Sequence, residues 1–196
     1  MTPPQPSPPL QPDPGPLTGT VVSVSRDDRH GFSKPAVGSI ILRAGYGVEG
    51  DAHAGATTQH RYLLKKDPAR ANLTQVHLLP AELFAELPGS TVPVGPGDLG
   101  ENVTTRGLLL RTLPRGTRLH LGADAVVEVT GLRSPCSLIN GFRPGLMKAL
   151  LGTDAAGLVE RRAGIMSIVT VSGTVQPGDR IRVELPAGEP VPLGVV

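Results

Sequence analysis

Aromatic residues are scarce in this chain of 196 residues, which contains three Phe, two Tyr and no Trp. Proteins that bind single-stranded nucleic acid stack the bases on aromatic side chains, and few such side chains are present here. The 19 basic residues are spread among 17 acidic ones, so the formal net charge is only +2. Without a long basic run to contact phosphates, we expect no nucleic-acid partner.

Cysteine is almost absent as well. A single cysteine, Cys136, excludes an internal disulfide and any zinc site built from several thiolates, and it fits a cytoplasmic protein. The sequence also lacks a run of about 18 apolar residues, and it lacks a basic stretch followed by an apolar segment. We therefore expect neither a membrane span nor secretion.

Proline is concentrated in the first 16 residues, where it takes eight positions and leaves almost no side chain that could join a core. We expect residues 1–16 to form an extended, disordered tail. Residues 17–196 then form a single domain, since a chain of this length buries roughly 70% of its unfolded surface. Its core must be mainly aliphatic.

From residue 17 onward, short β-branched and aliphatic runs alternate with Gly and Pro, a pattern typical of an all-β sandwich or barrel. Ile181, Val183 and Leu185, for example, alternate with charged residues, which indicates a strand with one buried face. Strands are predicted at residues 18–25, 39–42, 74–79, 102–105, 118–121, 125–130, 165–171 and 179–185.

Helical patterns are few and short. Residues 80–87 are predicted to form two helical turns, with Pro80 at the first helical position, and residues 144–151 show a similar pattern. The sequence therefore predicts a mainly β fold with a few short helices.

Cys136 is a candidate functional residue because it follows the strand predicted at 125–130, and functional residues often lie in the loops after strands. Arg133 and Arg143 are near it in sequence. A cationic neighbour favours the thiolate, which binds metals or attacks electrophiles. Two alternatives stay open, namely a nucleophile paired with a histidine and a thiol that is simply a small buried hydrophobe.

A glycine-rich segment at residues 97–105 is a second candidate, because glycines let backbone N–H groups approach a phosphate or a pterin. A hairpin loop without a ligand would use many of the same residues. The candidate residues in this segment are Gly97, Asp98, Gly100, Glu101, Asn102 and Thr104.

Histidines offer a weaker signal. His53 and His60 follow Asp51 closely, but their spacing matches no strong metal-binding motif. His77 and His120 fall within predicted strands, and we expect them to be hydrogen-bonded structural side chains.

Six short segments, taken together and in this order along the chain, point to a family. They are residues 50–53, 75–78, 97–105, 133–136, 162–166 and 173–179. Together, across about residues 18–186, they resemble the MOSC family, named after the C-terminal domain of molybdenum cofactor sulfurases. The resemblance implies a closed or partly closed, mostly antiparallel β-barrel of the pyruvate-kinase-barrel type. This expectation agrees with the strand pattern.

The resemblance also implies a cofactor and a site. The family binds molybdenum cofactor, a molybdenum–pterin, and the cysteine matching Cys136 is both a metal ligand and a catalytic residue in its reductase members. A thiolate is a soft donor suited to that metal. By the same resemblance Arg133, the residues of segment 97–105 and Arg162 surround the pterin or its phosphate.

Pyridoxal phosphate is a family-level association, carried by a large N-terminal desulfurase domain in full-length sulfurases. Only the proline-rich tail precedes the predicted barrel here, so we do not expect this cofactor in the chain.

Three functions follow from these observations. The first is reduction of small N-hydroxylated compounds, with electrons from a separate donor protein because no flavin or iron–sulfur motif is present. The second is a carrier of sulfur or molybdenum cofactor that uses a persulfide on Cys136 and meets a cofactor-delivery protein. The third is a structural barrel with a buried thiol.

Overall fold

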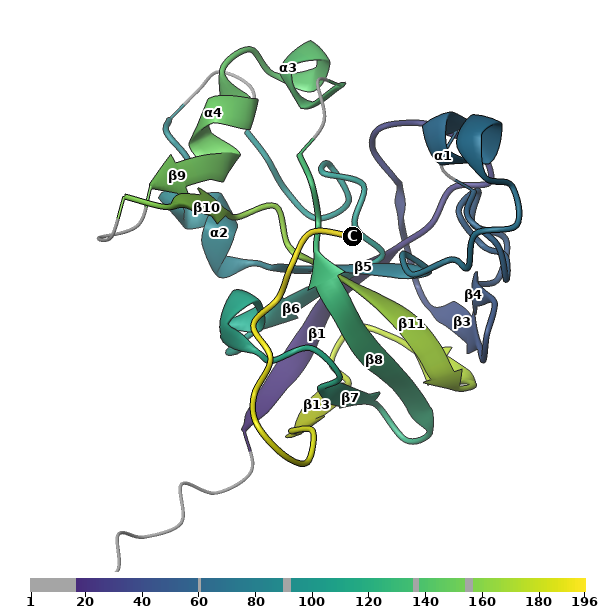
Figure 1. The fold of residues 1–196 in the computed structure, drawn as a ribbon. Helices are drawn as coiled ribbons and strands as arrows, with labels where there is room; N and C mark the ends of the chain where they lie inside the picture. Colours follow the sequence, from purple (N-terminus) through teal and green to yellow (C-terminus); the bar gives the residue numbers. More distant parts are fainter. Residues whose placement is uncertain (1–16, 60, 90–92, 136–137, 154–156) are drawn as a thin grey trace, which may run out of the picture.

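The computed structural model of the protein describes residues 17–59, 61–89, 93–135, 138–153 and 157–196. Within these residues the chain forms thirteen strands and four short helices (Figure 1). The mainly β class predicted from the sequence is confirmed. The predicted tail, residues 1–16, lies outside the described residues.

A closed barrel is the centre of the fold. In the described part of the chain, seven strands follow one another in the order β13, β7, β8, β11, β5, β6 and β1, and β1 pairs with β13 to complete the ring. Neighbouring barrel strands run antiparallel except for β5 and β6, which are parallel. The strands are β1 (Thr18–Ser25), β5 (Val76–Pro80), β6 (Val103–Arg106), β7 (Arg118–Leu121), β8 (Ala125–Leu132), β11 (Ile165–Val171) and β13 (Arg180–Glu184).

Smaller elements surround the barrel. β2 (Ala36–Val37) extends β1, while β3 (Ile40–Arg43), β4 (Gly47–Val48) and β12 (Gly173–Val175) form a separate sheet. β9 (Leu151–Thr153) and β10 (Val159–Arg161) pair with each other. The helices are α1 (Arg61–Lys66), α2 (Glu82–Glu86), α3 (Leu138–Phe142) and α4 (Leu146–Leu150), and Leu110–Thr112 form a 3₁₀ turn, η1.

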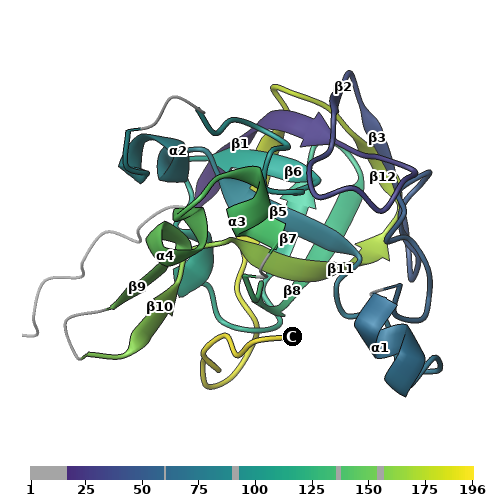
Figure 2. The ribbon, with the colours of Figure 1, turned by 90° about the horizontal axis from the view of Figure 1, so that it is seen from above.

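Helices gather at one end of the barrel, as Figures 1 and 2 show: α3 and α4 lie together with the β9–β10 pair, and α1 lies on the opposite side. None of the helices in the described residues is long and apolar enough to cross a membrane.

Two aliphatic clusters hold these parts together. The larger fills the barrel and includes Val127 and Ile165, while the smaller joins Leu79 of β5 to Ile139 of α3 and Leu150 of α4. All five side chains are fully buried. Each contributes roughly 1.5–3 kcal/mol of transfer free energy, so α3 and α4 are anchored on the barrel.

One sequence-based detail is wrong. Pro80 does not begin a helix; it is the last residue of β5, and α2 begins at Glu82. The reason is the parallel pairing with β6, where Ala81 N–H still donates to the carbonyl of Thr105 at 2.7 Å. The strand ladder therefore holds the chain extended past the point where a proline could start a helical turn.

Candidate functional site

A cavity of about 440 Å³, cavity A below, lies where β8 ends and where β6 and β11 begin. Its size is within the usual range of small-molecule pockets. Chain segments far apart in sequence form its walls, among them residues 31–34, 133–135 and Val196. Its polar side chains are Lys34, His53, Thr74, His77, Asn102, Arg133 and Ser134.

One lining residue of cavity A, Lys34, belongs to a buried ion pair. Lys34 Nζ lies 2.7 Å from Asp51 Oδ2, and the two side chains are only 5% and 2% exposed. Burial raises the pKa of Asp51, but a hydrogen bond from His53 and the charge of Lys34 outweigh this effect and hold the pKa well below its ordinary value. Asp51 is therefore an ionised carboxylate that fixes a lysine at the cavity.

Asn102 connects this ion pair to the strands. Its Nδ2 donates to Asp51 Oδ2 at 2.9 Å and to the Ser25 carbonyl at 3.2 Å, and its Oδ1 accepts the backbone N–H of His77 at 3.2 Å. Asn102 was predicted as a ligand-binding residue, and the structure brings it to cavity A. Its amide is already engaged on both sides, so it shapes the cavity wall through these bonds.

The other residues of segment 97–105 serve mainly to fold the loop. Gly97 N–H and the Thr104 hydroxyl both donate to Glu101 Oε1, at 2.6 and 2.9 Å. A side chain on Gly97 would collide with the Lys34 carbonyl, 2.1 Å from the position of its Cβ, and φ there is +86°. The loop therefore packs tightly against the backbone of Lys34.

Gly100 is the other member of this segment that lines cavity A. Asp98 instead accepts the N–H of Gly95 at 2.8 Å and closes the turn. Of the six residues proposed from this segment, the structure thus brings two, Gly100 and Asn102, to the cavity wall.

His77 behaves as the structural histidine that the sequence predicts. It is buried, and its Nε2 lies 2.8 Å from the carbonyl of Ala163, to which it donates. Burial, and next the charge of Arg133, lower the pKa of His77 well below its ordinary value. His77 is therefore neutral, and it ties β5 to the segment that leads into β11.

Among the described residues, no group of three His, Cys, Asp or Glu side chains is arranged to hold a metal ion. His60 lies outside the described residues.

The segment leading to the cysteine forms another wall. Arg133, Ser134 and Pro135 all line cavity A, and Arg133 N–H donates to the Gly164 carbonyl at 3.1 Å. The Arg133 guanidinium also lies 6.0 Å from the ring centre of Phe32, within the range of a cation–π contact. Cys136 itself lies outside the described residues.

The last residues of the chain support this segment from the other side. Leu132 N–H donates to the Gly194 carbonyl at 2.7 Å, and Val195 forms a parallel bridge with Leu132. Val196 lines cavity A. In Figure 1 the chain end accordingly lies beside the upper end of β8.

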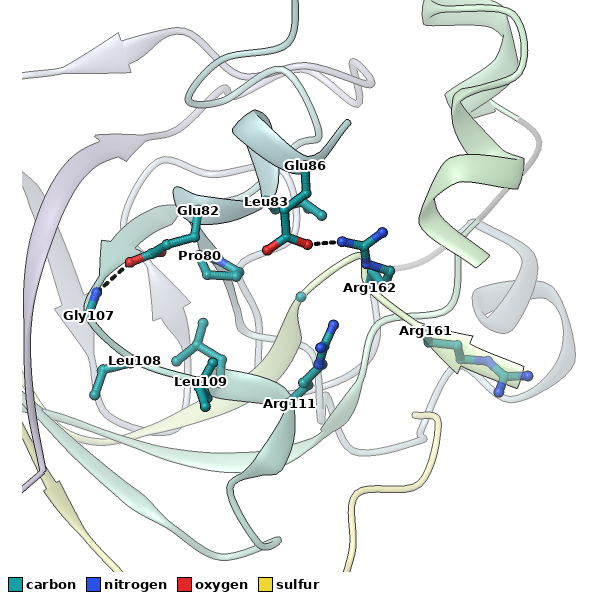
Figure 3. A pocket seen from close by; sticks show the side chains of 12 residues that line it. Pro80, Glu82, Leu83, Glu86, Gly107, Leu108, Leu109, Arg111, Arg161 and Arg162 are labelled. Atoms are coloured by element: carbon teal, nitrogen blue, oxygen red, sulfur yellow. Dashed lines mark hydrogen bonds and ion pairs between the residues drawn. The ribbon is translucent and has the colours of Figure 1, made fainter. Parts of the chain in front are cut away.

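Two arginines proposed near the thiol or the pterin do not line cavity A. Arg143 is buried and donates from Nη2 to the Pro88 carbonyl. Arg162 lines a separate cavity of about 270 Å³ between α2, η1 and β10, where it points toward Glu86 and forms an ion pair with it (Figure 3). Arg162 therefore lines a different cavity from Arg133 and Asn102.

Sequence reasoning did not select Lys34, and it used Asp51 and His53 only in a weak metal motif and as part of segment 50–53 of the family resemblance, without assigning either residue a role. Nothing around Lys34 in the sequence marks it, because its partner in the buried ion pair, Asp51, comes from a different loop.

Comparison with known proteins supplies the family. A family model described as MOSC domain matches residues 65–182, more than half of the chain. No curated protein matches the sequence.

Solved structures with a similar fold include YuaD from Bacillus subtilis, 24% identical, which covers 85% of this chain and 96% of its own, with a TM-score of 0.69. YiiM from Geobacillus stearothermophilus is 21% identical and has a TM-score of 0.56; the match covers 84% of this chain and 73% of the YiiM chain. YiiM from Escherichia coli is 18% identical, with 88% and 73% covered and a TM-score of 0.57. At these identities the likeness shows a shared fold.

Proposed function

The chain belongs to the MOSC domain family, and we propose that it binds molybdenum cofactor in cavity A and reduces small N-hydroxylated compounds with electrons from a separate protein. The family is associated with molybdenum cofactor binding and with sulfurase or reductase roles. One observation carries the proposal: the three residues directly before Cys136 line the same cavity as Lys34 and Asn102.

The chemistry of the cavity wall fits this cofactor. A molybdenum–pterin carries a phosphate and is an anion, and cavity A is lined by the cationic side chains of Lys34 and Arg133. The planar guanidinium of Arg133 suits a phosphate oxygen pair, and the ammonium of Lys34 acts as a compact charge beside it. The buried carboxylate of Asp51 holds Lys34 in position without lining the cavity itself.

Each residue then has a defined task. Cys136 would hold the metal through its thiolate, and Pro135 restricts the backbone before it. Arg133 and Lys34 would bind the anionic part of the cofactor. Leu138 and Met166 add apolar surface that limits water around the substrate. When bound, the cofactor supplies a centre that changes its oxidation state by accepting and passing on electrons.

The test is the substitution Cys136→Ser in protein made in a host that supplies molybdenum cofactor. We expect the variant to lose bound molybdenum and the reduction of a hydroxylaminopurine by reduced methyl viologen, while its circular dichroism and melting temperature stay near wild type. The exposed Ser39 offers a control, since Ser39→Ala should change neither property.

Two outcomes would contradict the proposal. Full molybdenum content in folded Cys136→Ser would remove the thiol as the ligand. Wild-type protein that carries a persulfide on Cys136 but reduces no N-hydroxylated compound would instead favour the sulfur or cofactor carrier.

A further inference from the structure

Few side chains at cavity A can exchange a proton, and His53 is the candidate among them. Arginine does not lose its proton in proteins, which excludes Arg133. Burial lowers the pKa of Lys34, but its side chain is only 5% exposed, so solvent cannot readily return a proton to it. Neutral His77 is buried with its Nε2 proton donated to Ala163. The His53 side chain, in contrast, is 36% exposed.

Asp51 fixes the orientation of His53. Its Oδ1 accepts the backbone N–H of His53 at 2.9 Å and lies 3.3 Å from the His53 Nδ1. Since an ionised carboxylate can only accept, the Nδ1 atom carries the hydrogen and Nε2 is the ring nitrogen left for other partners. A carboxylate in this position holds the imidazole in one orientation, as in catalytic dyads and triads.

The position of Asp51 is itself fixed. Lys34 and Asn102 hold its Oδ2 at 2.7 and 2.9 Å, so the carboxylate has little freedom to rotate away from the imidazole. The charged and titratable groups facing His53 are then Asp51, Lys34 behind it, and His30, whose ring centre lies 5.4 Å away in an edge-to-face contact. The arrangement is a Lys34–Asp51–His53 chain that ends at the cavity.

We propose that His53 is the proton donor of cavity A and that Asp51 is its positioning residue. This inference rests on the proposed function. Reduction of an N-hydroxylated compound follows R–NHOH + 2 e⁻ + 2 H⁺ → R–NH₂ + H₂O, with both electrons coming from the external donor protein. The N–O bond breaks, an N–H bond forms, and the oxygen leaves as water.

His53 supplies the protons of this balance. In its imidazolium form the ring carries a hydrogen on Nε2 as well as on Nδ1, and the Nε2 hydrogen protonates the leaving oxygen, which would otherwise depart as a costly hydroxide. The neutral imidazole then takes a proton from solvent, which its partial exposure permits, and delivers it to the nitrogen of the product. One histidine thus serves both proton transfers.

The test compares His53→Asn and Asp51→Asn with a control, His120→Asn, on β7. His120 bonds to Glu184 and does not line cavity A. All proteins are loaded with cofactor, their molybdenum content is measured, and turnover of a hydroxylaminopurine is followed with reduced methyl viologen. We expect His53→Asn to keep molybdenum and lose turnover by roughly 100-fold or more, a common cost of removing a general acid. His120→Asn should stay near wild type.

Two further measurements separate proton donation from a merely structural role. Imidazole in the buffer should restore part of the turnover of His53→Ala, because the cavity is open to small molecules. Nitrogen-resolved NMR of the cofactor-free protein should show the Nδ1–H tautomer of His53, and Asp51→Asn should shift it toward the Nε2–H form.

The outcomes are distinguishable. A wild-type protein that holds no molybdenum and reduces nothing overturns the proposed function and this inference with it. Wild-type turnover together with unchanged turnover in His53→Asn overturns the inference alone. An Nε2–H tautomer in the wild-type protein removes Asp51 as the positioning residue.

Discussion

Among single residues, Glu101 offers a test of how the loop beneath cavity A is stabilised. Its side chain is fully buried, and its Oε2 has no hydrogen-bond partner among the described residues. Burial raises the pKa of this carboxyl above 4.5, although hydrogen bonds from Gly97 and Thr104 oppose the shift. The folded protein therefore binds this proton more tightly than the unfolded chain does.

We predict from this shift that Glu101→Gln stabilises the protein at neutral pH, because the neutral amide places no charge in this buried site. Because the pKa of Glu101 is higher in the folded protein, its proton binding adds to the free energy of unfolding. This contribution is fully present below the unfolded pKa and is lost as the pH rises through the folded pKa. The advantage of the variant should hence shrink as the pH falls toward 4. Urea unfolding at pH 7 and pH 4 measures it. A variant clearly less stable than wild type at pH 7 would show that the ionised carboxylate holds the loop.

Prediction from sequence succeeds unevenly at this scale. Local pattern is enough to place His77 in a strand as a structural side chain and to mark Asn102. It is not enough for Lys34, because the partner that permits its burial, Asp51, comes from a different loop. The Arg162 assignment depended on the family motif, and the observed ion pair with Glu86 depends on where α2 lies.

Among the elements, the contact between β8 and the last residues of the chain depends on Gly131. A methyl group on Gly131 would lie 2.6 Å from the Gly194 carbonyl oxygen and 2.7 Å from Val196 Cγ1. We predict that Gly131→Ala destabilises the protein by about 1–3 kcal/mol or displaces residues 194–196, as other overpacked sites do. Urea unfolding and limited proteolysis near residue 194 measure the two effects.

Gly141, in α3, is a matched control because no atom lies within 4 Å of the position of an added Cβ. Gly141→Ala should be neutral or slightly stabilising, since alanine is the better helix former. Equal stability and equal protease resistance in the two variants would mean that the chain end is not packed against β8 as described.

The strands were largely predictable because alternation and turn residues act locally. β1, β7 and β11 coincide with the predicted ranges, and the other predicted strands differ by one or two residues at an end. The β9–β10 pair and α1 were not predicted. Such short elements have little pattern of their own, and β10 is held by tertiary contacts such as the Arg111–Glu160 ion pair.

At the scale of the whole molecule, residues 1–16 should be dispensable for stability, because they contain little that could join an aliphatic core. We predict that a variant lacking them melts within about 2 °C of the full chain, which corresponds to well under 1 kcal/mol for a protein of this size. Differential scanning calorimetry measures this. A large fall in the melting temperature would show that these residues pack on the barrel.

The β1–β13 pairing has a consequence for the order of events during synthesis. β1 emerges from the ribosome early, yet its partner Arg180–Glu184 follows some 160 residues later, after roughly ten seconds or more at usual translation rates. The residues that line cavity A are as far apart along the sequence, since they include both Gly31 and Val196. A growing chain therefore has neither a closed barrel nor a complete cavity A until these residues have left the ribosome. Until then the edge of β1 lacks β13, and this is the stage at which a chaperone would matter most.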